Sequence, residues 1–138
     1  MNKAIRISIS DNQGEVSAEI IEPDQMKAVM VLAHGAGASI YHSFMVQLVE
    51  ALAIHQIGSL RYNFLYMEKG KKRPDPAAIA EHTVKQVFDK AHELFPNTPI
   101  IAGGKSFGGR MTTQYLSKTA VSFIKGIVLF GFPLHPVG

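Results

Sequence analysis

The distribution of hydrophobic residues along the chain predicts alternating strands and helices. Residues 3–10 alternate isoleucine with polar side chains, and a second run at residues 15–22 follows the turn residues DNQG, which predicts an antiparallel hairpin. The stretch AVMVLA at residues 28–33 is apolar without alternation, as is typical of a strand buried on both faces of a parallel sheet. The expected class therefore changes from antiparallel β to α/β.

Three helices and three further strands are expected after this strand. Asp75 is expected to cap the second helix, with Pro76 at its first position. The predicted order is β-β-β-α-β-α-β-α-β, a single domain over residues 1–138 with a mostly parallel sheet, helices on both faces and an N-terminal antiparallel hairpin. The helices are expected from residue 40 to about 55, from residue 76 to before Pro96 and at 108–118, and the strands at 58–64, 99–104 and 126–132.

Composition limits the function classes that need to be considered. The chain has 138 residues, 46% of them hydrophobic, which suits one core. Its net charge of +3 is too small to imply nucleic-acid binding. The one basic cluster, KGKKR at residues 69–73, could bind a carboxylate or phosphate of a substrate, but we favour the interpretation that it is a solvated loop. The absence of cysteine excludes disulfides, thiolate metal sites and a cysteine nucleophile. We expect no metal, cofactor or membrane partner, and a cytoplasmic location because the first residues lack a secretory signal.

The glycine-rich stretch GGKSFGG at residues 103–109 raises two alternatives, a phosphate-binding loop and a nucleophilic serine. A Walker A loop would need its first glycine at position 99, which is Pro99. A dinucleotide-binding fingerprint in HGAGAS also fails, because Ile40 stands where the third glycine belongs. Both nucleotide-binding interpretations are therefore excluded.

The same stretch satisfies the pattern G-x-S-x-G between a predicted strand and a predicted helix. In such a turn, called a nucleophile elbow, the serine adopts a strained conformation that exposes its hydroxyl, and the flanking residues must be small because the strand and helix backbones nearly touch. The helix that follows directs its N-terminal dipole toward the serine. The pattern is formed by Gly104, Lys105, Ser106, Phe107 and Gly108.

Backbone N–H groups around this turn are candidates for an oxyanion hole. The N–H of Phe107, the residue after the serine, is one expected donor. The second is expected from the loop HGAG that follows the strand at residues 28–33, with the Ala36 N–H as the first candidate and the Gly37 N–H behind it.

These motifs resemble the α/β-hydrolase superfamily, and more narrowly its small dienelactone-hydrolase-like branch related to the Tex and KANL proteins. The resemblance is carried by VLAHGAGAS, RYNFLYMEKGKKRPDP, GGKSFGGRM and GFPLHP, and it covers most of the chain from about Val29 to Pro136. It implies a mostly parallel sheet and a Ser-Asp-His triad in which Ser106 is the nucleophile. The implied activity is hydrolysis of a small ester, lactone or thioester substrate.

The chain departs from the family pattern after Ser106. It contains no Asp or Glu beyond that residue, and its one later histidine is His135, which the resemblance assigns to the GFPLHP motif rather than to the triad. His135 is a candidate substitute base. We favour the other interpretation, that the chain is truncated after about six strands. In a truncated chain the last strand would be an open edge, which favours a homo-oligomer. The alternative function is a non-catalytic, hydrolase-like binding or scaffolding module.

Three other residues are candidates for the pocket. Arg61 and Asn63 end a predicted strand on the side where open parallel sheets bind ligands, although Arg61 could equally pair with a carboxylate and fix a loop. His34 precedes the glycine of the HGAG loop, and we expect it to be a hydrogen-bonded support rather than a base or a metal ligand.

Overall fold

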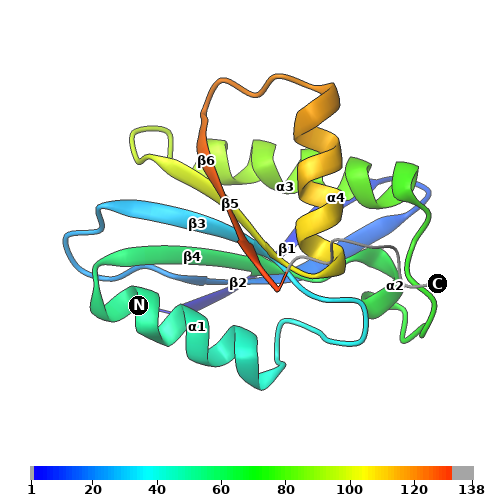
Figure 1. Cartoon of the computed structure of the whole chain (residues 1–138), viewed down its shortest axis with the longest axis horizontal. Coiled ribbons are helices and arrows are strands. Elements are labelled where there is room, and N and C mark those ends of the chain that lie inside the picture. The colour runs from blue at the N-terminus through cyan, green and yellow to red at the C-terminus, as the bar shows by residue number, and fades with distance from the viewer. Residues whose placement is uncertain (1, 132–138) are drawn as a thin grey trace.

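The structure is a computed structural model of the chain and describes residues 2–131. Its six strands form one sheet in the order β1-β2-β4-β3-β5-β6 (Figure 1). The strands β3, β4, β5 and β6 run parallel, whereas β1 and β2 form an antiparallel hairpin that joins the sheet through an antiparallel β2–β4 pair. The strands are β1 (Asn2–Ser10), β2 (Gly14–Ile21), β3 (Ala28–Ala33), β4 (Ile57–Tyr62), β5 (Ile100–Lys105) and β6 (Ile124–Phe130).

The helices cover both faces of the sheet, as the sequence predicts. Helix α1 lies on one face, and α3 and α4 lie side by side on the other (Figure 1). The predicted elements are present, with their ends shifted by a few residues. The helices are α1 (Ser43–Ile54), α2 (Leu65–Glu68), α3 (Ala77–Leu94) and α4 (Phe107–Lys118).

Strand β3 is buried on both faces, which explains its unbroken apolar sequence. Met30 and Leu32 pack with α1 residues Met45 and Val49 on one face. The alternate residues of β3 belong to the larger core cluster on the other face, which also contains buried residues of α3 and α4. In the hairpin, the predicted alternation is confirmed because Ile7 and Ile9 are buried, whereas Arg6 and Ser8 are exposed.

Two local predictions differ from the structure. The prediction that Asp75 caps α3 is wrong: Pro76 is the N-cap residue, and no side chain caps the helix. The Asp75 carboxylate instead accepts a hydrogen bond from the Tyr66 N–H at 3.1 Å. That N–H begins the short helix α2, which sequence periodicity did not predict and whose first N–H groups have no acceptor within the helix.

Strand β6 lies at the edge of the sheet and is unusually exposed for an apolar strand. Ile127, Val128 and Leu129 are 42%, 37% and 39% exposed, whereas β3 is almost fully buried. Beyond its pairing with β5, no strand in residues 2–131 pairs with β6. Among the helices of the same residues, none is both long and apolar enough to cross a membrane.

Candidate active site

Ser106 lies on a sharp turn between the end of β5 and the start of α4. Its backbone has φ 52° and ψ −112°, a combination that non-glycine residues rarely adopt and that costs about 1–3 kcal/mol. The Ser106 N–H donates to the carbonyl of Phe130 at the end of β6, at 3.1 Å. The backbone of this residue is therefore held in a strained conformation by the elements on both sides.

Glycine is required in this turn because three pieces of backbone meet there. A Cβ atom on Gly104 would lie 2.4 Å from the Gly109 nitrogen, and one on Gly108 would lie 2.4 Å from the His34 carbonyl oxygen. Both distances are far shorter than any contact a Cβ tolerates, and the atoms it would meet belong to the backbone and have little freedom to move. The predicted need for small residues around Ser106 is confirmed. We call residues 104–109 the Ser106 turn.

The first residue of α4 is Phe107, so its N–H has no acceptor within the helix. This N–H lies at the positive end of the helix dipole, directly after Ser106. The Phe107 ring is buried and contacts the rings of Phe64 and Tyr66, with centroid distances of 5.3 and 5.9 Å. These contacts anchor the start of α4 against the segment that follows β4.

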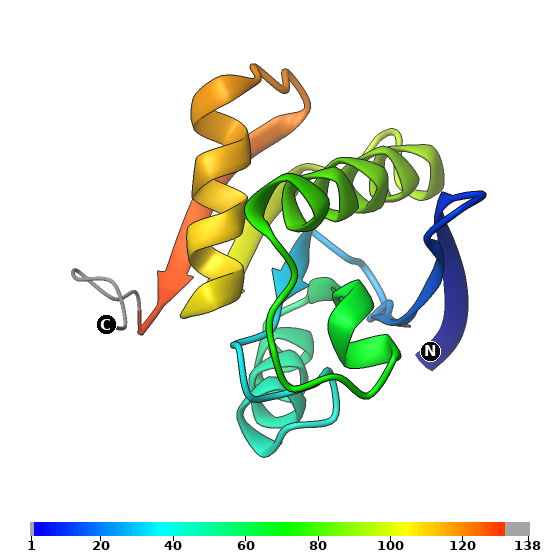
Figure 2. The same ribbon diagram turned by 90° about the vertical axis from the view of Figure 1, so that its right-hand side faces the viewer.

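The loop after β3, residues 34–40, runs beside the Ser106 turn, and we call it the glycine loop. Figure 2 shows this loop, α2 and the start of α4 gathered at one end of the sheet. A Cβ atom placed on Gly35 would lie 3.8 Å from the Ser106 Cβ. The Ala38 N–H donates to the Gly35 carbonyl at 3.2 Å and closes a tight turn around Ala36 and Gly37. The structure therefore brings Ser106, Phe107 and the HGAG motif together.

His34 supports the glycine loop from inside the protein. Its Nε2 accepts a hydrogen bond from the Phe64 N–H at 3.0 Å, which leaves Nδ1 to carry the proton and to donate to the Gly35 carbonyl at 2.7 Å. Burial lowers the pKa of His34 to about 4, against a smaller opposing effect of the Gly35 hydrogen bond. His34 is therefore neutral near pH 7 with both ring nitrogens occupied, as expected of a support.

Arg61 and Asn63 hold the far end of the glycine loop. The Arg61 Nε donates to the Ile40 carbonyl at 2.9 Å, and the Ile40 N–H donates to the Asn63 Oδ1 at 3.1 Å. Arg61 also forms an ion pair with Glu19 at 3.3 Å. Both side chains are more than nine-tenths buried, and these contacts match the loop-fixing alternative for Arg61.

Glu68 connects this support to the hairpin. It accepts hydrogen bonds from the Asn63 amide, at 3.0 Å, and from the backbone and hydroxyl of Ser17, and it forms an ion pair with Arg6. Burial raises the pKa of Glu68, but these hydrogen bonds outweigh it and lower the pKa to about 2.

Tyr66 is a site residue that sequence reasoning missed. Its hydroxyl donates to the Ala36 carbonyl at 2.7 Å, in the middle of the glycine loop, and its side chain is 1% exposed. Burial raises the pKa of Tyr66 well above its ordinary value, with a further contribution from Asp75, so the hydroxyl keeps its proton. The available signal was the aromatic run in RYNFLY at the end of a predicted strand, which gives no indication of the acceptor.

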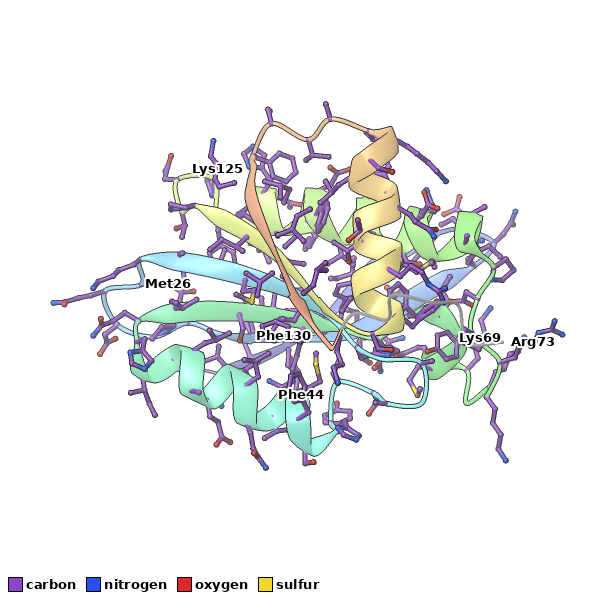
Figure 3. The ribbon with its side chains drawn as sticks, in the orientation of Figure 1. Met26, Phe44, Lys69, Arg73, Lys125 and Phe130 are labelled. Atoms are coloured by element: carbon purple, nitrogen blue, oxygen red, sulfur yellow. The ribbon has the colours of Figure 1, made fainter. Side chains whose placement is uncertain are left out.

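The remaining predicted residues have other surroundings or lie outside the described residues. The Lys105 ammonium lies 5.1 Å from the centre of the Phe44 ring, and Figure 3 shows Phe44 beside Phe130 at the end of β6. The KGKKR segment at 69–73 is exposed, and its Lys69 and Arg73 side chains point away from the body of the molecule (Figure 3). His135 lies outside the described residues.

The described part of the chain does not pair Ser106 with a base. Within residues 2–131 the Ser106 hydroxyl makes no hydrogen bond. The same residues contain no group of three or more histidine, aspartate or glutamate side chains that could hold a metal ion. The arrangement thus presents a strained serine, a helix N-terminus and a braced glycine loop.

Comparison with known proteins identifies the family. Residues 26–138 match the model of a family described as alpha/beta hydrolase domain. The fold and this match make the chain a member of the α/β-hydrolase superfamily, as the motifs predicted.

Two curated fungal proteins are similar to part of the chain. Probable cutinase 1 of Aspergillus niger is 44% identical over 61 residues, which is 42% of this chain and 22% of that protein. Probable cutinase 5 of Aspergillus terreus is 44% identical over 59 residues, which is 41% of this chain and 26% of that protein. The matched segments therefore represent about a quarter of each cutinase.

Solved structures share the fold at low sequence identity. Dienelactone hydrolase from Anabaena variabilis superposes with a TM-score of 0.79 at 14% identity, covering 94% of this chain and 62% of that chain. An alpha-beta serine hydrolase homologue from Coxiella burnetii also gives 0.79, at 17% identity, covering 98% of this chain and 65% of that chain. This chain spans less than two thirds of the length of either structure.

Proposed function

We propose that the protein is a serine hydrolase that acts on a small ester, lactone or thioester through Ser106. The observation that carries this proposal is the strained backbone of Ser106, φ 52° with ψ −112°, in a non-glycine residue between a strand and a helix. Such strain persists only where the surrounding structure maintains it, and it is typical of functional sites. The glycine loop beside the Ser106 turn and the N–H of Phe107, which has no acceptor within α4, give further support.

The substrate class rests on relatives and on the chemistry of the site. The two similar fungal proteins are named as cutinases, and structural neighbours are named as a dienelactone hydrolase, a lipase and a carboxyl esterase. Backbone N–H donors suit the oxyanion that forms when a hydroxyl attacks an acyl carbonyl. An ester-like carbonyl is therefore the substrate group we propose.

In the proposed reaction, the Ser106 Oγ attacks the carbonyl carbon and the electron pair of the C=O bond moves to oxygen. The N–H groups of Phe107 and Ala36, with Gly37 behind, stabilise this oxyanion. The serine proton passes to a base of the imidazole class and then to the departing alcohol or thiol, leaving an acyl-enzyme that water hydrolyses. The resemblance to the family implies that such a base follows Ser106 in the chain.

Intact-mass spectrometry after treatment with a fluorophosphonate tests the proposal. Such a reagent phosphonylates an activated serine with loss of fluoride, so we expect one adduct on the wild type and none on Ser106→Ala. The variant Ser122→Ala is a matched control, because it removes an exposed serine hydroxyl outside the Ser106 turn and the glycine loop and should leave the adduct unchanged. A wild type without an adduct, or an adduct that persists in Ser106→Ala, would contradict the assignment.

The second candidate is a non-catalytic, hydrolase-like binding module. The observation that favours it is that the Ser106 hydroxyl has no imidazole or carboxylate partner within residues 2–131. A serine hydroxyl without a base is a weak nucleophile at neutral pH. The fluorophosphonate experiment separates the two candidates, since a module of this kind would not react.

A further inference from the structure

The peptide between Ala36 and Gly37 is the centre of a turn that has two accessible orientations. The Ala38 N–H donates to the Gly35 carbonyl at 3.2 Å, so Ala36 and Gly37 are the two central residues. Turns of types I and II differ by a flip of this central peptide, and type II needs a positive φ at its second central residue, where glycine is preferred. Gly37 occupies that position but does not have a positive φ. The turn therefore does not have the type II orientation, which glycine at this position would also allow.

A single side-chain hydrogen bond holds the central peptide in this orientation. The Tyr66 hydroxyl donates to the carbonyl of Ala36, the oxygen that moves to the opposite side in the flip, at 2.7 Å. The Tyr66 ring cannot easily follow such a movement, because it packs against the rings of His34, Phe64 and Phe107. The hydroxyl is thus a fixed donor, and the carbonyl is tied to it.

This hydrogen bond also determines where an N–H group points. In a trans peptide the C=O and the following N–H point in opposite directions, and no peptide of the described residues is cis. Fixing the Ala36 carbonyl therefore fixes the Gly37 N–H. In the same way, the hydrogen bond from His34 to the Gly35 carbonyl fixes the Ala36 N–H. Each of the two candidate oxyanion donors in the glycine loop has its peptide plane held by a different buried ring.

We propose that Tyr66 is a positioning residue that prevents the Ala36–Gly37 peptide from flipping. In the flipped orientation the Ala36 carbonyl would replace the Gly37 N–H and repel a developing oxyanion. The effect on catalysis rests on the proposed function. The orientation of the Ala36–Gly37 peptide can be measured independently of any activity. Asp75 completes the arrangement, because it accepts the Tyr66 N–H at 3.1 Å and so anchors the backbone that carries the ring.

The variant Tyr66→Phe removes the hydroxyl and keeps the ring, and Tyr62→Phe is its matched control. The Tyr62 hydroxyl is also fully buried and meets no hydrogen-bond partner at bonding geometry within residues 2–131. We expect solution NMR of Tyr66→Phe to show a shifted Ala36 carbonyl and new microsecond-to-millisecond exchange at the Gly37 amide. Tyr62→Phe should leave both signals as in the wild type. Wild-type signals in Tyr66→Phe would overturn the proposal.

A rescue experiment tests the flip itself. Alanine at position 37 disfavours the positive φ that the flipped turn needs, and its Cβ would have open space, with no atom within 4 Å. Adding Gly37→Ala to Tyr66→Phe should therefore suppress the exchange and return the Ala36 carbonyl shift toward its wild-type value. Persistent exchange in the double variant would show that the hydroxyl does not act by preventing a flip.

The catalytic consequence is measured by the rate at which a fluorophosphonate labels Ser106. Complete loss of an oxyanion donor typically costs about 10²–10³-fold, so an intermittently flipped peptide should slow labelling by about tenfold in Tyr66→Phe and leave Tyr62→Phe unchanged. An unchanged rate in Tyr66→Phe, with the NMR change present, would overturn the catalytic meaning. A wild type that never reacts would contradict the proposed function, while the NMR result alone would still decide the position of the peptide.

Discussion

The Ser106 turn and the glycine loop lie side by side, yet they are shaped by different interactions. Around Ser106, the conformation depends on backbone segments that approach so closely that Gly104 and Gly108 cannot carry a side chain. The glycine loop instead depends on hydrogen bonds between its peptide groups and the side chains of His34, Arg61, Asn63 and Tyr66. A single substitution in the Ser106 turn should therefore disrupt the local packing as a whole. A single substitution among the supports of the glycine loop should remove one hydrogen bond and leave the others in place.

The largest expected effect is that of Gly108→Ala. Its Cβ would lie 2.4 Å from the His34 carbonyl oxygen and 2.7 Å from the Ala33 carbonyl carbon, so strand and helix would have to separate. We expect a loss of about 3 kcal/mol or more in the free energy of unfolding, measured by urea denaturation. The control is Gly126→Ala in β6, whose Cβ would meet no atom within 4 Å. Equal free energies of unfolding for the two variants would contradict the conclusion that close backbone packing shapes the Ser106 turn.

Acidification should weaken the glycine loop through His34. Burial lowers the pKa of His34 from the ordinary 6.5 to about 4. Between these pH values the ring is protonated in the unfolded chain and neutral in the folded protein. Stability is therefore complete above pH 6.5 and falls toward pH 4, by up to about 3 kcal/mol from this group. NMR titration of the His34 ring provides the check, with the urea-unfolded chain as reference. Protonation of the folded ring near pH 6.5 would refute this expectation.

A smaller effect is expected for Asn63→Ala. The substitution leaves the buried Ile40 N–H without its acceptor and removes one donor from Glu68, which should cost about 1–3 kcal/mol. Hydrogen exchange at Ile40 should accelerate while that of the Ser106 turn stays near its wild-type value. Asn97→Ala, at an exposed position, is the control. Equal acceleration in both regions would mean that they do not behave independently.

The smallest effect on folding is expected at β6, which supports the Ser106 turn through the Phe130 carbonyl. We propose that this exposed apolar edge makes the chain self-associate, as the sequence suggested. Sedimentation measured over a concentration series should show association for the wild type and a monomer for Val128→Lys, with little change in stability. A wild type that remains monomeric at high concentration would exclude this proposal.

The sequence predicted the Ser106 turn better than the glycine loop. The spacing of Gly104, Ser106 and Gly108 expresses a local requirement, because the residues that must be small are adjacent to the serine. Strands and helices were likewise predictable, since their burial follows a period of two or of about 3.6 residues. Local rules were therefore sufficient for the elements and for one half of the candidate site.

The supports of the glycine loop follow no local rule. Tyr66 reaches a carbonyl 30 residues away, and its role depends on how β3 and β4 are placed in the sheet. Helix α2 is only four residues long, too short for a periodic pattern to be detected. From the sequence, Asp75 was expected to cap the helix that follows it. In the structure its carboxylate instead accepts the Tyr66 N–H, which has no acceptor within α2. Tertiary contacts decided each of these cases.

The contacts of the glycine loop have a consequence for how the chain folds during synthesis. Arg61, Asn63 and Tyr66 lie within six consecutive residues, and their contacts with the loop span 21 to 30 positions of the sequence. Such separations carry a modest loop-closure entropy. In contrast, the hydrogen bond from the Ser106 N–H to the Phe130 carbonyl can form only when almost the whole described chain is present. On the ribosome, the contacts of the glycine loop can therefore form before β6, which holds the Ser106 turn, has emerged.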